Sequence, residues 1–153
     1  MSGLNWRIEA PNGEGMSEWR RMRHALWPEM SEAENFQETK ALAEGPKAFV
    51  RLALDGQGRA AGFVEATLRT DYVNGCETSP VAFLEGIYVE PWARRQGVAR
   101  GLVEVVQKWA EKMNCSEMAS DALLENTDSH GMHLAVGFEE TERVVYFRKI
   151  LTQ

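Results

Sequence analysis

The chain is poor in cysteine, in long apolar runs and in positive charge, and each shortage excludes a class of protein. Its two cysteines, Cys76 and Cys115, form no CxxC motif and no paired His–Cys spacing, so neither a disulfide framework nor a structural metal site is expected. No stretch approaches the roughly 18 apolar residues of a membrane helix, and the first residues do not resemble a signal peptide. These absences predict a reduced, cytoplasmic protein that holds no metal.

Positive charge is in the minority, because 17 lysines and arginines face 23 aspartates and glutamates, for a formal net charge of −6. A protein that coats a nucleic-acid backbone needs excess positive charge on one face, and a polybasic membrane anchor needs the same. We therefore expect no nucleic-acid partner and no membrane partner. A cationic small molecule is still a possible ligand, since acidic clefts attract cations. The alternative is that the mild acidity only keeps the protein soluble.

The length of 153 residues, without a repeat, a low-complexity tract or a linker, predicts a single domain over residues 1–153. Hydrophobic periodicity and turn signals mark the elements. A serine at position 17 is expected to cap the first helix, and the capping box Ser31-x-x-Glu34 the second. The expected helices cover residues 17–27, 31–44, 98–113 and 126–136, and the expected strands 6–10, 49–54, 61–68, 81–89, 115–120 and 138–149.

The order of these elements predicts an α/β fold built on one mixed sheet. A hairpin joins the strands at 49–54 and 61–68 through the turn Asp55-Gly56-Gln57-Gly58. The strand at 81–89, the amphipathic helix at 98–113 and the strand at 115–120 form a βαβ crossover, whose two strands run parallel. The sheet is therefore expected to be antiparallel early and parallel in the middle, with helices packed on it.

The turn after the strand at 81–89 gathers positive charge in this acidic chain. It reads Pro91-Trp92-Ala93-Arg94-Arg95-Gln96-Gly97-Val98-Ala99-Arg100 and lies between a strand end and a helix start. Free N–H groups and the helix dipole attract anions there, and Gly97 lets the backbone approach a ligand closely. The turn therefore suits a phosphate group. An ordinary turn glycine among solvated arginines is the alternative.

These residues resemble a known family. Arg94-x-x-Gly97-x-Ala99 after an apolar strand is similar to the acetyl-CoA pyrophosphate loop of the GCN5-related N-acetyltransferases (GNAT), and Gly137-Phe138 matches that family's second landmark. A wider set of motifs resembles the aminoglycoside 6′-N-acetyltransferases. That set comprises Leu26-Trp27-Pro28, Asp71-Tyr72-Val73-Asn74-Gly75, Ser79-Pro80, Phe83-Leu84-Glu85-Gly86-Ile87-Tyr88-Val89, Met118-Ala119-Ser120-Asp121, Glu125-Asn126 and the segment 137–144.

The resemblance implies the GNAT acyl-CoA N-acyltransferase fold, with a mostly antiparallel sheet and a central parallel βαβ wedge. It implies transfer of acetyl from acetyl-CoA to the 6′-amine of aminoglycoside antibiotics, which confers resistance. It also implies a homodimer, in which the apolar closing strand is a covered edge. The coenzyme contacts that it implies are Ile87, Tyr88, Val89, Arg95, Gln96, Gly97, Val98, Ala99, Arg100 and Asn126.

Two carboxylates stand out as candidate catalytic groups. Glu85 interrupts the apolar run and shares its alternation with Val81, Phe83, Ile87 and Val89; a buried carboxylate needs a partner or a purpose. Asp121 ends the next parallel strand, and open α/β sheets bind ligands beyond strand C-termini. We expect both to flank that crevice, unless they are structural carboxylates satisfied by backbone donors or arginine. The resemblance implies that both contact substrate ammonium groups. Because an ammonium must lose a proton before it attacks, we expect Glu85 to accept that proton through a water molecule.

The resemblance adds three further substrate contacts. It makes Trp27 and Tyr72 aromatic walls for the sugar rings, and Glu142 a contact for an ammonium group. The alternatives are a core tryptophan, an ordinary strand tyrosine and a solvated charge. Many superfamily members carry a proton-donating tyrosine four residues before the Gly-Phe pair, where this chain has His133, so no side-chain acid is assigned.

Two other functions stay open at this point. One is a GNAT enzyme that acetylates a peptide or another polyamine, and the other is a non-catalytic acetyl-CoA-binding module. Neither cysteine is placed as an acyl carrier, so we expect direct attack by the amine without an acetyl-enzyme.

Overall fold

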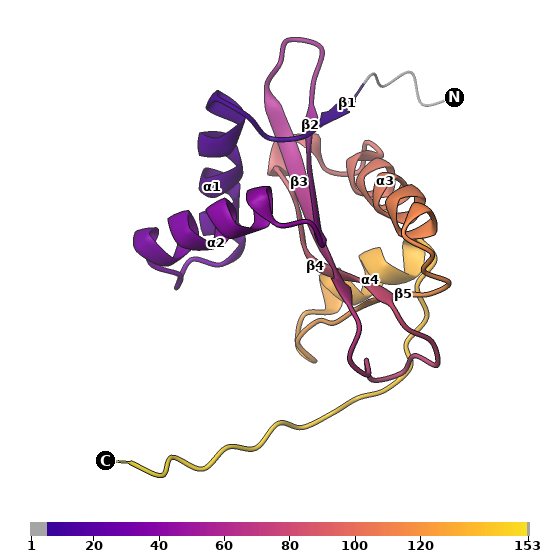
Figure 1. The fold of residues 1–153 in the computed structure, drawn as a ribbon. Coiled ribbons are helices and arrows are strands. Elements are labelled where there is room, and N and C mark those ends of the chain that lie inside the picture. The colour runs from indigo at the N-terminus through magenta and orange to yellow at the C-terminus, as the bar shows by residue number, and fades with distance from the viewer. Residues whose placement is uncertain (1–5, 153) are drawn as a thin grey trace.

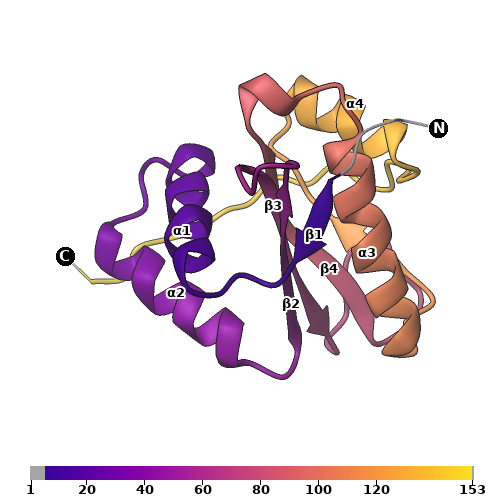
Figure 2. The same ribbon diagram turned by 90° about the horizontal axis from the view of Figure 1, so that it is seen from above.

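The computed structural model describes residues 6–152 as one mixed sheet with helices on both faces (Figures 1 and 2). The five strands lie in the order β1-β2-β3-β4-β5, and every neighbouring pair is antiparallel except β4 and β5, which are parallel. The expected mixed sheet with a parallel βαβ unit is therefore confirmed. The strands are β1 (Arg7–Glu9), β2 (Ala48–Leu54), β3 (Ala60–Arg69), β4 (Val81–Val89) and β5 (Met118–Ser120).

The helices divide between the two faces of the sheet (Figure 2). On one face α1 (Glu14–Leu26) and α2 (Glu32–Glu44) cover a core built around Trp19, Met22 and Phe63. On the other, α3 (Val98–Lys112) buries Leu102 and Val106 against the sheet. A short 3-10 helix (Pro91–Ala93) precedes α3, and α4 (Thr127–Ala135) follows β5. No helix in the part of the chain described here is long and apolar enough to cross a membrane.

One of the two expected helix caps is present. The hydroxyl of Ser31 accepts from the Glu34 amide at 3.1 Å, and the Glu34 carboxylate accepts from the Ser31 amide at 3.2 Å, which completes the capping box of α2. The expectation for Ser17 was wrong, because α1 begins three residues earlier, after Gly13. Gly13 has φ of 52°, a conformation that favours glycine, and it lets the chain turn into the helix.

Strand β4 contains a β-bulge at Glu85. In the register with β3, Leu84 faces Ala66 and Gly86 faces Glu65, which leaves Glu85 without an opposing residue. A bulge changes the face to which later side chains point. Ile87 and Val89 consequently pack against the α3 core, so the alternation that was expected to relate them to Glu85 does not hold.

The C-terminal segment differs from expectation. The closing strand at 138–149 is absent, because residues 138–152 have no ladder partner among the described residues, and the segment extends away from the sheet (Figure 1, yellow). Its apolar side chains are therefore uncovered, with Tyr146 at 82% and Phe147 at 91% exposure. The expected strand at 115–120 shortens to Met118–Ser120, since only these residues pair with β4.

A buried ion pair joins α1 and α2 to the sheet. The Arg23 guanidinium in α1 donates to the Glu65 carboxylate in β3 at 2.6 Å, and both side chains are at most 3% exposed. Arg23 also donates to Asn35 and Glu38 of α2, at 3.0 and 2.9 Å, and Trp19 donates to Glu65 at 2.9 Å. Burial raises the pKa of the Glu65 carboxyl, against the opposing effect of Arg23. Every charge at this centre is hydrogen-bonded, as the low dielectric requires.

Replacing Arg23 by methionine should lower the free energy of unfolding by about 3–5 kcal/mol, because Glu65 is then a buried charge without a partner. Denaturant unfolding measures this loss. A carboxyl whose pKa is raised on folding destabilises the native state as pH rises, so the deficit should grow as pH rises above the ordinary pKa of glutamate, about 4.3.

The control is Arg7→Ala, which removes an arginine from the exposed pair with Glu9. This change should stay within about 0.5 kcal/mol of the parent protein. Equal losses in the two variants, or a deficit in Arg23→Met that shrinks as pH rises, would contradict the role of the buried pair.

Candidate active site

The candidate site lies where β4 and β5 separate. The two parallel strands pair only through Ala82, Phe83 and Leu84, and the last pair joins Leu84 to Ser120. Strand β4 continues for five more residues along β3, while β5 ends. Glu85 and Asp121 are the residues directly after this last pair, so the two candidate carboxylates stand on the two sides of the split. Divergent parallel strands are where open sheets bind ligands.

Glu85 is partly buried and is held by two neighbours on β3. Its carboxylate accepts from the Thr67 hydroxyl at 2.6 Å and from the Arg69 guanidinium at 3.0 Å, through both oxygens. Its side chain is 27% exposed and that of Arg69 is 44% exposed. The carboxylate is therefore oriented by the sheet and still accessible to a ligand. Sequence reasoning missed both neighbours, although residues 65, 67 and 69 alternate on one face of β3.

Trp27 stands beside the bulge. A Cβ on Gly86 would lie 2.5 Å from Cη2 of the Trp27 indole, so only glycine permits this contact. The indole also meets the Phe63 ring edge-on at 6.4 Å and lies under the Arg23 guanidinium at 5.0 Å. Trp27 is partly buried at the C-cap of α1. It thus has core contacts and, at the same time, forms a wall next to Glu85.

Tyr72 directly precedes a residue that packs on the same face. Val73 is buried against Val81 and Phe83, and the Arg69 guanidinium that binds Glu85 lies 3.5 Å above the Phe83 ring. The Tyr72 side chain itself is 75% exposed. The segment before β4 therefore packs through Val73 on the face that carries Glu85, and it exposes the Tyr72 ring to solvent.

The second half of β4 has backbone groups that face the split. The Glu90 amide donates to the Ala61 carbonyl of β3, so strand alternation directs the amides of Ile87 and Val89 away from β3. Beyond Leu84 no strand of the described sheet covers that side. An extended ligand can pair there as an added strand does.

The start of α3 is an open anion site next to this edge. Gly97 has φ of 85°, and a Cβ there would meet no heavy atom of the described residues within 4 Å. No side chain in the part of the chain described here caps the helix, so the first-turn amides from Val98 to Arg100 point outward. The helix dipole and exposed Arg95 add positive potential at the same place.

Several side chains hold the loop before α3 in place. The Arg94 guanidinium donates to the Val89 carbonyl at 2.8 Å, and the Trp6 indole donates to the Gln96 carbonyl at 3.0 Å. Arg100 donates to the Ala135 carbonyl of α4 at 2.9 Å. The arginine-bearing loop is therefore attached to β4 at one end and to α4 at the other.

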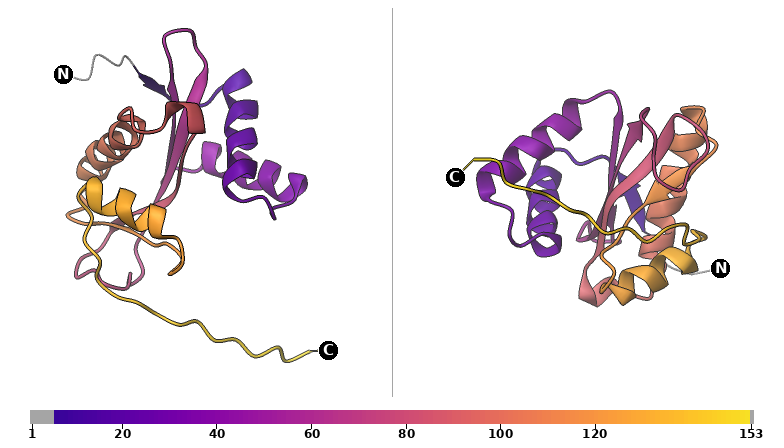
Figure 3. Two further views of the ribbon diagram at one scale, coloured as in Figure 1. Left: turned by 180° about the vertical axis from the view of Figure 1, so that it is seen from behind. Right: turned by 90° about the horizontal axis from the view of Figure 1, so that it is seen from below.

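Helix α4 lies on the α3 side of the sheet (Figure 3). Asn126 caps it by accepting from the Ser129 amide at 3.2 Å. His133 lies at the split: Nε2 is 2.7 Å from the Ser120 hydroxyl, and Nδ1 is 2.7 Å from the Ser129 carbonyl. A carbonyl only accepts, so Nδ1 carries a proton. The Ser120 hydroxyl also lies 3.2 Å from the Leu84 carbonyl, where the strands part.

Two predicted residues lie apart from these contacts. Asp121 and Glu142 are exposed, and within residues 6–152 neither side chain takes part in a hydrogen bond or ion pair. Asp121 directly follows β5, whereas Glu142 lies in the extended C-terminal segment. Among the acidic residues of α2, Glu38 forms an ion pair with Arg23, so its charge stabilises the fold.

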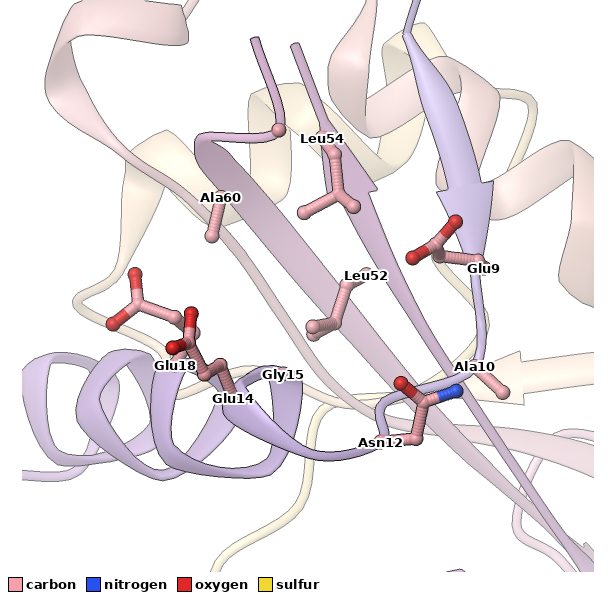
Figure 4. A pocket seen from close by; sticks show the side chains of 10 residues that line it. Glu9, Ala10, Asn12, Glu14, Gly15, Glu18, Leu52, Leu54 and Ala60 are labelled. Carbon is pink, nitrogen blue, oxygen red and sulfur yellow. The ribbon is translucent and has the colours of Figure 1, made fainter.

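Two recessed surfaces of the described residues lie away from the split. One small pocket opens between the start of α1 and strands β1 to β3, with Glu14 and Glu18 at its rim and Leu52 and Ala60 at its floor (Figure 4). A second is lined by β2 and α3, around Phe49 and Trp109. Neither contains a residue predicted for the site, and the site is an open split rather than a closed cavity.

The fold, and the split between β4 and β5, are those of a family of acyltransferases. Residues 15–138 match the acetyltransferase (GNAT) family, and the chain belongs to it.

Proteins that are similar to this chain in sequence have a more specific name than the family. The chain is 50% identical over 134 residues to the aminoglycoside N(6′)-acetyltransferase type 1 of Acinetobacter genomosp. 13, covering 88% of this chain and 91% of that protein. It is 49% identical over 140 residues to the protein of the same name from Serratia marcescens, covering 90% and 94%.

Two solved structures are similar to this chain over nearly its whole length. AAC(6′)-Iy in complex with a bisubstrate analogue, CoA-S-monomethyl-acetylneamine, has a TM-score of 0.90 at 42% identity, covering 95% of this chain and 99% of the other. The aminoglycoside antibiotic 6′-N-acetyltransferase AAC(6′)-Ih from Acinetobacter baumannii has a TM-score of 0.88 at 45% identity, covering 98% and 100%.

Proposed function

We propose that the protein transfers the acetyl group of acetyl-CoA to the 6′-amine of aminoglycosides and thereby confers resistance to these antibiotics. The observation that carries the proposal is the split between β4 and β5, with Glu85 and Asp121 directly after the last pair of residues. The names of the similar enzymes, and the analogue bound by one of them that joins CoA to an aminoglycoside, support the choice of substrates. Acetylation turns an ammonium group into a neutral amide and so removes one positive charge.

The residues around the split fit acetyl-CoA. The free edge at Ile87, Tyr88 and Val89 suits the amide-bearing pantetheine arm. The open amides from Arg95 to Arg100 suit the pyrophosphate, because a helix N-terminus and Gly97 leave room and positive potential for it. A backbone amide near Val89 would stabilise the negative charge that develops on the carbonyl oxygen of the thioester. Asn126, at the start of α4, completes the proposed coenzyme contacts.

Gly97→Ala should weaken CoA binding about tenfold, since alanine is strained at φ of 85° and adds a methyl group where the pyrophosphate would lie. Calorimetric titration with CoA measures the change. Gly58→Ala is a matched control, because Gly58 has φ of 83° and equally open surroundings in the hairpin turn far from the split. Both variants should lose similar stability. Equal CoA affinity in the two would contradict the proposed coenzyme site.

The amine must lose a proton before it attacks, because an ammonium nitrogen has no lone pair. Glu85 is the proposed acceptor of this proton through a water molecule. Thr67 orients its carboxylate, and exposed Arg69 can be replaced there by the substrate's ammonium without leaving a buried charge unpaired. Asp121 and Glu142 are proposed to hold other ammonium groups, and Trp27 and Tyr72 to flank the sugar rings. Holding the amine against the thioester would supply much of the rate.

Glu85→Gln should reduce kcat/KM for aminoglycosides by about 100-fold or more, because it removes the proton acceptor and one negative charge. Asp121→Asn should mainly raise the KM of the aminoglycoside. A CoA-release assay, run on aminoglycosides with and without a free 6′-amine, measures both. Glu111→Gln, on the exposed side of α3, is the control and should leave the kinetics unchanged. Unchanged kinetics in both test variants, or activity only on compounds without the amine, would overturn the assignment.

The protein is also proposed to be a cytoplasmic homodimer. Its cysteines are free thiols, as expected in a reducing compartment. Residues 143–151 carry exposed apolar side chains on an extended backbone, and β5 is an edge of the described sheet. An apolar segment and a strand edge both require cover. Because the segment leads away from its own sheet (Figure 3), we assign that cover to a second copy.

Sedimentation equilibrium should give twice the chain mass for the parent protein, and one chain mass for the double variant Tyr146→Asp and Phe147→Asp, because charge cannot be buried in an apolar contact. Leu124→Asp changes an apolar side chain that is also open to solvent, at 59% exposure, in the loop before α4, and should stay dimeric. A monomeric parent protein would contradict the homodimer.

A further inference from the structure

We propose that Glu117 is a positioning residue for the aminoglycoside: its carboxylate fixes the segment 71–80, and through that segment it sets the place of Tyr72. This inference rests on the proposed function. Glu117 lies directly before β5 and belongs to none of the groups assigned to substrate or coenzyme. Its side chain is directed to the segment 71–80 and not to the split.

One carboxylate oxygen of Glu117 collects the donors of this segment. Oε1 accepts from the Glu77 amide at 2.9 Å, from the Thr78 amide at 2.8 Å and from the Thr78 hydroxyl. The Thr78 hydroxyl is also 3.3 Å from that of Ser116. These donors lower the pKa of Glu117, first through Thr78 and then through Glu77. The carboxylate therefore stays charged at neutral pH and loses its hold only when pH falls through the lowered pKa.

The backbone of Glu117 is attached to the sheet. Its carbonyl accepts from the Ala82 amide of β4 at 3.3 Å, so the residue cannot follow the segment if the segment moves. The Cys76 thiol lies at the same carboxylate, and its pKa is raised by burial and then by Glu117. Glu117 thus connects the segment 71–80 to the start of the parallel β4–β5 pair, whose other end carries Glu85 and Asp121.

The segment is in contact with the C-terminal chain on another side. Gly75 has φ of 86°, and a Cβ there would lie 2.2 Å from Oγ1 of Thr141, so the Thr141 side chain packs directly on the backbone of Gly75. Thr141 is adjacent to Glu142. The segment that Glu117 holds therefore also contacts the C-terminal chain next to Glu142.

The contacts between Glu117 and the substrate face form a short series. Glu117 holds residues 76–78, and Val73 packs on Phe83. Arg69 lies over the Phe83 ring and binds Glu85. Release of Glu117 would let the exposed Tyr72 ring move relative to Glu85, while the coenzyme edge of β4 and the start of α3 have no part in these contacts. The expected effect is selective for the aminoglycoside.

Kinetics of Glu117→Ala test the inference. We expect the KM of an aminoglycoside with a free 6′-amine to rise about tenfold, as the loss of hydrogen bonds to a charged group allows. The KM of acetyl-CoA and kcat should stay within about twofold. Glu117→Gln keeps an acceptor oxygen, so it should restore part of the affinity. The control Glu111→Ala should behave as the parent protein. Equal rises in both KM values would overturn the proposal.

A double-mutant cycle with Tyr72→Ala separates positioning from general stability. If Glu117 acts through Tyr72, the double variant should have the same aminoglycoside KM as Tyr72→Ala alone. Independent, additive effects would contradict this link. Should Glu117→Ala fail to fold, the cycle with Glu117→Gln decides in the same way.

Hydrogen exchange makes the anchoring testable without any substrate. The amides of Glu77 and Thr78 should exchange about tenfold faster in Glu117→Ala, while amides of β3 stay protected. Unchanged exchange would refute the anchor. Failure of the proposed function is a different outcome: the parent protein would then release no CoA with aminoglycosides while exchange still responds to Glu117.

Discussion

The structure depends on a change of partner in the middle of one strand. Up to Leu84, β4 is hydrogen-bonded on both sides, and beyond it only β3 remains. This unequal pairing creates the split, leaves the amides of Ile87 and Val89 without a strand partner, and puts Glu85 and Asp121 at the point of separation. The bulge at Glu85 adds a second effect, because it turns the later side chains of β4 to the opposite face. One local irregularity therefore separates the proposed coenzyme edge of β4 from the proposed substrate face.

Three glutamates have different roles because their surroundings differ. Glu65 is almost fully buried and is satisfied by Arg23 and Trp19, so it joins α1 and α2 to the sheet. Glu85 lies on the same face of the sheet, in the neighbouring strand β4. It is only partly buried and is paired with Arg69, which is more exposed than Arg23, so it can exchange partners. Glu117 is bound mainly by backbone amides. A fixed charge on β3, an exchangeable charge on β4 and an anchor directly before β5 thus lie in neighbouring parts of the sheet.

Much of the fold was predictable, because local signals agreed with the tertiary structure. The capping box at Ser31, the hairpin turn at Asp55 and the amphipathic pattern of α3 each rest on interactions within a few residues. The start of α1 was misplaced, because Gly13 provides the turn without a capping side chain. The closing strand was misplaced for another reason: apolar alternation indicates an extended segment but cannot supply the neighbouring strand.

The sequence by itself determined the residues available for chemistry, the order of the elements and the position of the arginine-bearing loop, since these depend on side-chain type and short-range spacing. Only the tertiary structure decided which groups meet. The pairing of Glu85 with Thr67 and Arg69, the bulge that redirects β4, and the attachment of residues 76–78 to Glu117 all join positions that are distant along the chain. Such contacts depend on strand register and helix packing, and no local pattern encodes them.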